Sequence, residues 1–184
     1  SVEEVVEELE RIHREVKREI DEVVDRLREI NEEVRREIKE VLDKIREDLE
    51  RLKEEIDRDL KDKKTADRLK EEIDRLLREV EETVERLERR HEDAKRRTRE
   101  RVEELKRRHD KVLDEIRELI RRGVSDDILR EMLRKSEELV RESREDLKRL
   151  LEEHRKLVEE SRRELERLKK EVKDAVEEVR RRLK

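Results

Sequence analysis

The sequence has no cysteine, proline, phenylalanine, tyrosine or tryptophan, and it has a single glycine. Without cysteine the chain cannot form a disulfide, a thiolate metal site or a thiol nucleophile, so the redox compartment is left open. Without aromatic rings it has no platform on which the bases of a nucleic acid could stack. A folded core must therefore be built mainly from leucine, isoleucine and valine.

Long apolar runs are also missing. No run approaches the roughly 18 residues of a membrane-spanning helix, and the N-terminal residues lack the charged-then-apolar order of a secretory signal. Charged residues make up 62% of the chain, and its 55 basic and 60 acidic side chains are closely interspersed. We therefore expect a soluble chain with no membrane partner and no targeting signal, and its localisation stays unknown.

The spacing of the apolar residues distinguishes this chain from a disordered one, although high charge without aromatics is typical of disorder. They recur every eleven residues in the first third and every 18 in the rest, as in the series Val5, Val16, Leu27, Ile38, Leu49, Leu60 and the series Leu129, Leu147, Leu165, Leu183. These repeats correspond to about 3.67 and 3.6 residues per turn, which predicts nearly straight helices rather than left-handed heptad coils.

Two short segments interrupt the helical pattern. In residues 61–65 the apolar spacing stops, and Thr65 is expected to cap the next helix. In residues 122–127 Gly123 suits the left-handed position after a helix, and Ser125 suits the N-cap of the following one. We predict helices at about 2–61, 66–121 and 126–183. Short loops make neighbouring helices antiparallel, so the predicted fold is all-α, a single long up-down-up antiparallel three-helix rod over residues 1–184.

Three pairs of polar residues lie within the apolar stripes, and the members of each pair are separated by about five helical turns. Both members of a pair therefore face the same way, about 27 Å apart. Given the loop positions, residue i of the first helix faces about 126 − i of the second, and residue j of the second faces about 248 − j of the third. This register predicts two buried polar layers and an accessory polar core: His13, His109 and Ser136; Asn31, His91 and His154; and Thr98, Ser143 and Ser161.

Buried polar groups need hydrogen-bond partners. A neutral histidine can donate from one ring nitrogen and accept at the other, so it can link two helices. A slipped helix would leave these groups without partners, and we therefore expect the layers to specify the helix register. The alternative is that they are incidental polar residues at the stripe boundaries, where His13 and Asn31 lie.

Metal binding and catalysis are weaker interpretations of the same residues. Glu10-x-x-His13 and Glu88-x-x-His91 have the spacing of di-iron bundles, but both glutamates project away from the apolar stripes. Two imidazoles with a serine or an asparagine make a poor zinc ligand set. Ser136 and His109 could touch, but no buried carboxylate or oxyanion hole is indicated. We predict no metal, no cofactor and no enzymatic activity.

Partners are not required by the sequence, and we expect a monomer. Paired arginines such as Arg89-Arg90 and Arg107-Arg108 suggest nucleic acid, but interspersed glutamates weaken a phosphate contact. The stretch that holds these arginines would face about residues 18–37, which carry 5 basic and 8 acidic side chains. Doubled apolar positions such as Val5-Val6 widen the stripes, so one alternative is an interaction module that binds a fourth helix or a second copy.

A second alternative is a pH-responsive bundle. Histidines that are buried in the neutral form have a lowered pKa, so the unfolded chain binds more protons in acid. Their contribution to stability would be intact above about pH 6.5 and would erode below it.

Regular 11- and 18-residue repeats, idealised caps, minimal loops and a surface saturated with Glu, Lys and Arg occur together in this sequence. Over its whole length the chain resembles de novo designed parametric three-helix bundles. The resemblance implies a structural scaffold with no natural biochemical function, in which buried hydrogen-bond networks specify one assembly. Spectrin-like rods share the up-down-up topology, but their aromatic core residues are absent here.

Overall fold

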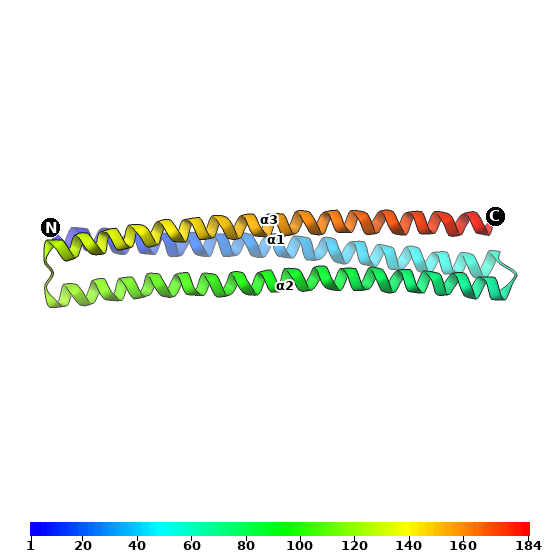
Figure 1. Cartoon of the computed structure of the whole chain (residues 1–184), viewed down its shortest axis with the longest axis horizontal. Coiled ribbons are helices and arrows are strands. Elements are labelled where there is room, and N and C mark those ends of the chain that lie inside the picture. Colours follow the sequence, from blue (N-terminus) through cyan, green and yellow to red (C-terminus); the bar gives the residue numbers. More distant parts are fainter. The chain divides into compact units, whose positions relative to one another are not determined.

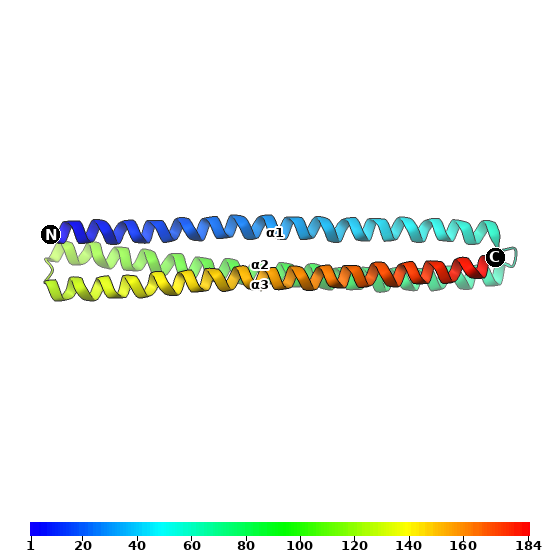
Figure 2. The ribbon, with the colours of Figure 1, turned by 90° about the horizontal axis from the view of Figure 1, so that it is seen from above.

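The computed structural model describes all 184 residues and contains three α-helices and no strand (Figure 1). They are α1 (Val2–Asp59), α2 (Lys63–Arg122) and α3 (Asp126–Leu183). The helices pack against one another, and the chain reverses direction at each of the two loops (Figure 2). The predicted all-α, up-down-up three-helix class is confirmed. None of the helices is long and apolar enough to cross a membrane.

A serine hydroxyl caps the start of α1 and of α3, and the cap at Ser125 is the predicted one. The Ser1 Oγ accepts a hydrogen bond from the Glu4 N–H at 3.3 Å, and the Ser125 Oγ accepts one from the Ile128 N–H at 3.5 Å. Gly123 has φ +85° and is the only residue of the chain with positive φ. That conformation strains any residue with a Cβ, which explains why the single glycine stands there.

The start of α2 differs from the prediction. The helix begins at Lys63 and not after Thr65, because Asp62 takes the N-cap and its carbonyl accepts the Ala66 N–H at 3.0 Å. The Thr65 hydroxyl donates to the Asp62 Oδ2 at 2.7 Å from within the first turn. Aspartate is at least as good a cap as threonine, and Ala66 in the first turn is buried against the core.

The three helices divide into two compact units, each with a segment of every helix. Unit 1 comprises Ser1–Glu29 and Asp93–Arg155, and unit 2 comprises Ile30–Glu92 and Lys156–Lys184. The continuity of a single rod over residues 1–184 stays a prediction.

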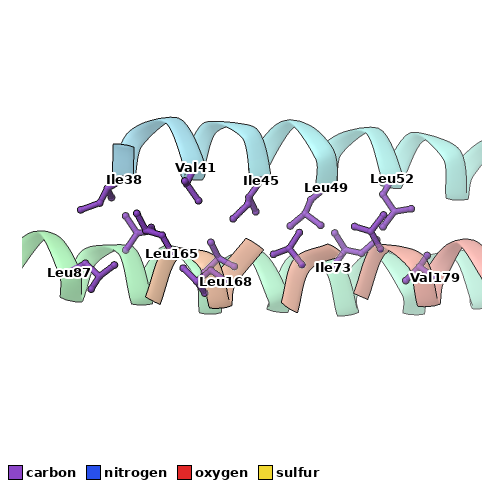
Figure 3. Packing of buried hydrophobic residues seen from close by; sticks show 14 of the residues in the cluster. Ile38, Val41, Ile45, Leu49, Leu52, Ile73, Leu87, Leu165, Leu168 and Val179 are labelled. Carbon is purple, nitrogen blue, oxygen red and sulfur yellow. The ribbon is translucent and has the colours of Figure 1, made fainter. Parts of the chain in front are cut away.

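Unit 2 has one continuous aliphatic core. Side chains of all three helices point toward one another in Figure 3, where Ile45 and Leu49 come from α1, Ile73 from α2 and Leu168 from α3. Full burial of such a side chain contributes about 1.5–3 kcal/mol before the loss of chain entropy is counted. The core of this unit is thus built from aliphatic side chains alone.

The core of unit 1 consists of two aliphatic clusters. One contains Val16 and Leu105, and the other contains Leu9 and Val112. His13 lies between Leu9 and Val16 along α1, and His109 lies between Leu105 and Val112 along α2. The division of the core therefore falls where the polar residues are.

Ion pairs between α1 and α2 show the register of these two helices. In unit 1 the Lys17 Nζ lies 2.5 Å from an Asp110 carboxylate oxygen, and Lys106 lies 2.6 Å from Asp21. In unit 2 the corresponding pairs are Lys53–Asp74 and Lys70–Asp57. In all four pairs residue i of α1 meets residue 127 − i of α2, one residue from the predicted 126 − i.

Bidentate pairs of arginine and glutamate join α1 to α3. The partners are 125 residues apart in each case: Glu19 with Arg144 in unit 1, and Glu37 with Arg162 and Glu55 with Arg180 in unit 2. In unit 2, the equal separation of the two pairs shows that α1 and α3 run in the same direction. Exposed pairs of this kind contribute about 0.2–1 kcal/mol each, so they adjust register more than they stabilise.

Candidate functional site: the buried histidine network

Four buried polar residues of unit 1 form a continuous hydrogen-bonded chain across all three helices. The Nδ1 atoms of His13 on α1 and His109 on α2 lie 2.7 Å apart. The His13 Nε2 lies 2.9 Å from the Ser136 Oγ, and the His109 Nε2 lies 2.8 Å from the Ser143 Oγ, both on α3. All four residues are 0% exposed. We call Ser136–His13–His109–Ser143 the unit 1 chain.

The unit 1 chain can satisfy all its ring nitrogens with both histidines neutral. Each neutral ring carries one N–H, and only one of the two facing Nδ1 atoms can carry a proton. If His13 donates from Nδ1, its Nε2 accepts from Ser136, while His109 donates from Nε2 to Ser143. The opposite direction is equally satisfied. The chain therefore has two complete arrangements, related by the tautomers of both rings.

Burial keeps these histidines neutral at pH 7. It lowers the pKa of His13, and it lowers the pKa of His109 to about 4. For His109 the charges of His13, Arg108 and Lys17 act in the same direction as burial, and Asp110 acts against them. Removal from water disfavours the charged imidazolium because the low-polarity core solvates it poorly.

A second set of contacts repeats part of this geometry. In unit 2 the His91 Nε2 lies 2.7 Å from the Ser161 Oγ; His91 stands one repeat before His109, and Ser161 one repeat after Ser143. In unit 1 the His154 Nε2 lies 2.7 Å from the Thr98 Oγ1, and burial lowers the pKa of His154. The buried histidine network is thus in unit 1, and unit 2 has one related contact, made by the half-buried His91.

The structure brings the first predicted layer together around His13, which contacts both His109 and Ser136. The residues of the second predicted layer belong to different units, with half-buried Asn31 and His91 in unit 2 and His154 in unit 1. The grouping of Asn31 with His91 and His154 stays a prediction.

The residues that we predicted as an accessory polar core contact the histidines directly. Thr98, Ser143 and Ser161 are each buried and each lie within hydrogen-bonding distance of a histidine. In these contacts residue j of α2 meets residue 252 − j of α3, one helical turn from the predicted 248 − j. The signal in the sequence was that Ser143 and Ser161 are separated by the same interval as His91 and His109.

The arrangement is poorly suited to catalysis. The contact between Ser136 Oγ and His13 Nε2 has the length expected of a nucleophile and its base, but both side chains are 0% exposed. The other nitrogen of His13 faces His109 rather than an orienting carboxylate. No group of three or more histidine, aspartate or glutamate side chains is placed to hold a metal ion.

Comparison with known proteins returns no matching family model, no matching curated protein and no matching solved structure.

Proposed function

We propose that the chain is a structural scaffold, in which the buried histidine network selects one arrangement of the three helices. The observation that carries this proposal is the position of His13, which uses one ring nitrogen toward α2 and the other toward α3. A helix pair alone would satisfy only one of these nitrogens. The complete unit 1 chain therefore forms only when its residues on α1, α2 and α3 lie at the same level along the helices.

The apolar and ionic contacts are less selective because they recur at a regular interval of about five helical turns. The pairs Glu19–Arg144 and Glu37–Arg162 differ by one repeat, and so do core positions such as Leu147 and Leu165. A helix displaced by one such repeat would recover contacts of both kinds. The polar positions do not all repeat in this way, since Asn31 rather than a histidine stands one repeat after His13.

Within one chain the short loops already limit such displacement. The network then discriminates against shifted pairing between different chains, and against α3 packing on the opposite side of the α1–α2 hairpin. Either arrangement would leave buried polar atoms without partners, at about 1–3 kcal/mol for each. We infer that this specification, in a chain of de novo design, is the role of the network. The regular repeats and idealised caps support that origin.

The test compares breaking the unit 1 chain with removing it. His13→Leu alone leaves buried polar atoms of His109 and Ser136 without their partner, so we expect a loss of about 1–3 kcal/mol in urea unfolding. The fourfold variant His13→Leu, His109→Leu, Ser136→Ala, Ser143→Ala should be about as stable as the parent, because apolar replacement of a whole buried polar group is often neutral or stabilising.

The scaffold proposal concerns specificity, which NMR and light scattering measure. We expect the fourfold variant to give doubled or broadened amide signals from residues 1–29 and 93–155, or a mixture of masses. Signals from residues 30–92 and 156–184 provide the internal control. A single sharp set of signals from a single species would show that the network is not needed to select the arrangement.

A further inference from the structure

The facing Nδ1 atoms of His13 and His109 form an unusual contact between two titratable groups. They are 2.7 Å apart, the ring centroids are 4.9 Å apart, and the ring planes are inclined by 64°. This separation is typical of a hydrogen bond, and there is room for one proton between the two nitrogens. The geometry of this contact therefore depends on the total number of protons on the two rings.

We propose that the His13–His109 pair binds one additional proton with the unit 1 chain intact, and that a second additional proton breaks the chain and opens unit 1. The pair would thus be a proton-binding site with a defined capacity. The inference uses the geometry of the pair alone and does not rest on the scaffold role.

The first added proton requires only a rotation of a hydroxyl group. One ring becomes an imidazolium and donates from both nitrogens, while the other stays neutral, accepts at Nδ1 and donates from Nε2. All three hydrogen bonds of the chain persist. The hydroxyl that donated before, on Ser136 or Ser143, now accepts, and its own proton turns away from the ring.

The second added proton cannot be accommodated in the same geometry. Both Nδ1 atoms would then carry hydrogens that point at one another across 2.7 Å. Neither atom has a lone pair left to accept, and two positive charges would lie side by side in a core that solvates them poorly. The rings must separate, which removes the link between α1 and α2 at the division of the unit 1 core.

The neighbouring charges do not offset that second proton. Lys17 of α1 is paired with Asp110 of α2, and Arg108 of α2 is paired with Glu142 of α3. The direct contacts from α3 are the hydroxyls of Ser136 and Ser143. The positive charges of Arg108 and Lys17 oppose a further proton on the pair.

The direction of the pH dependence follows from the lowered pKa values. Between about pH 6.5 and 4 the folded chain holds fewer protons on His109 than the unfolded chain does, so stability falls as the pH falls through this window. Above pH 6.5 the contribution is complete. Because the two rings interact strongly, they titrate as a pair in two macroscopic steps.

Nitrogen-15 NMR of the histidine side chains, recorded together with backbone amides from pH 8 to pH 3, tests the proposal. In the parent chain we expect the nitrogens of both rings to shift together in a first step, with its midpoint below 6.5 and the amide signals of unit 1 retained. A second step at lower pH should coincide with loss of those signals.

The chain itself offers a matched control, because asparagine occupies the position one repeat after His13 on α1. In His13→Asn we expect a single titration step at His109, and a smaller drop in unfolding free energy between pH 7.5 and pH 4 than in the parent. The same carboxylates are present in both proteins, so their titration cancels in the comparison. The reciprocal variant His109→Asn makes the same test if His13→Asn does not fold at pH 7.5.

Three outcomes would overturn the proposal. One is independent titration of the two rings with midpoints near 6.5, and another is loss of the unit 1 signals in the first step. The third is an equal drop in unfolding free energy between pH 7.5 and pH 4 in the parent and in the asparagine variant, which would assign the acid response to the carboxylates.

Discussion

Each of the four histidines has a hydroxyl oxygen 2.7–2.9 Å from its Nε2 atom. Serine and threonine suit this position because a hydroxyl can donate to or accept from the ring, whichever the tautomer requires. They are also small, so a bulky ring and a short side chain can share one level of an aliphatic core. The Nδ1 atom remains for a second contact, which in the unit 1 chain joins the two rings.

The contribution of one such hydroxyl can be measured at Thr98. Thr98→Val keeps the shape of the side chain and removes the hydroxyl that lies 2.7 Å from the buried His154 Nε2. We expect a loss of about 1–3 kcal/mol in urea unfolding at pH 7.5, because a buried ring nitrogen loses this hydrogen bond.

Thr83→Val on the same helix is the matched control. The Thr83 hydroxyl donates to the Glu79 carbonyl at a more exposed position, so its replacement should change the unfolding free energy by less than about 0.5 kcal/mol. Equal effects of the two substitutions would indicate that the Thr98–His154 contact adds nothing specific.

At the level of whole elements, the helices are delimited by a small number of residues. Ser1, Asp62 and Ser125 accept the first N–H groups of α1, α2 and α3. Gly123, the first residue after α2, ends that helix by adopting a left-handed conformation. Elsewhere the helices continue for 58 to 60 residues without a proline or a glycine, since their stability comes from packing of one apolar face.

The backbone requirement at Gly123 predicts a graded response to substitution. A Cβ added there would meet no atom within 4 Å, so only the left-handed φ of +85° opposes a side chain. We expect Gly123→Ala to lower the unfolding free energy by about 1–2 kcal/mol. Gly123→Asn should lower it less, because asparagine visits this conformation more readily. Thermal or urea unfolding of the two variants would check the order, and equal stability of alanine and glycine would contradict it.

At the level of the whole molecule, almost all large apolar side chains are buried or partly buried within the units. The only large apolar residues that are clearly exposed are Ile120 and Ile128, which flank the α2–α3 loop at 39% and 43% exposure. Cross-helix ion pairs line the boundaries around the cores. Such a surface gives little area for association.

We therefore expect a monomer, and light scattering in dilute buffer should give a mass near 22.9 kDa. A mass of two or more chains would contradict this expectation and favour the interaction-module alternative. In that case Ile120→Lys with Ile128→Lys would test whether the exposed pair is responsible, because two charges there should restore the single-chain mass.

The sequence by itself determined the helices, their direction and the polar positions of the core. Apolar residues at helical spacing can bury a continuous face only as helices, and residues 61–65 and 122–127 break that spacing. The division into three helices and the left-handed Gly123 therefore needed no tertiary information. The same periodicity showed that His13, His109 and Ser136 lie on apolar stripes.

Only the tertiary structure decided which polar atoms meet. The register inferred from loop positions was four residues off at the histidine contacts between α2 and α3, and one or two residues off at the ion pairs between these helices. A difference of four residues is enough to exchange Ser143 for Ser136 as the nearest serine to His109. Asp62 rather than Thr65 caps α2 for a related reason, since both residues are competent N-caps and the spacing of apolar residues does not rank them. Hydrogen bonds act over about 3 Å, so contacts at this scale depend on how the side chains of three helices pack, which periodicity alone does not specify.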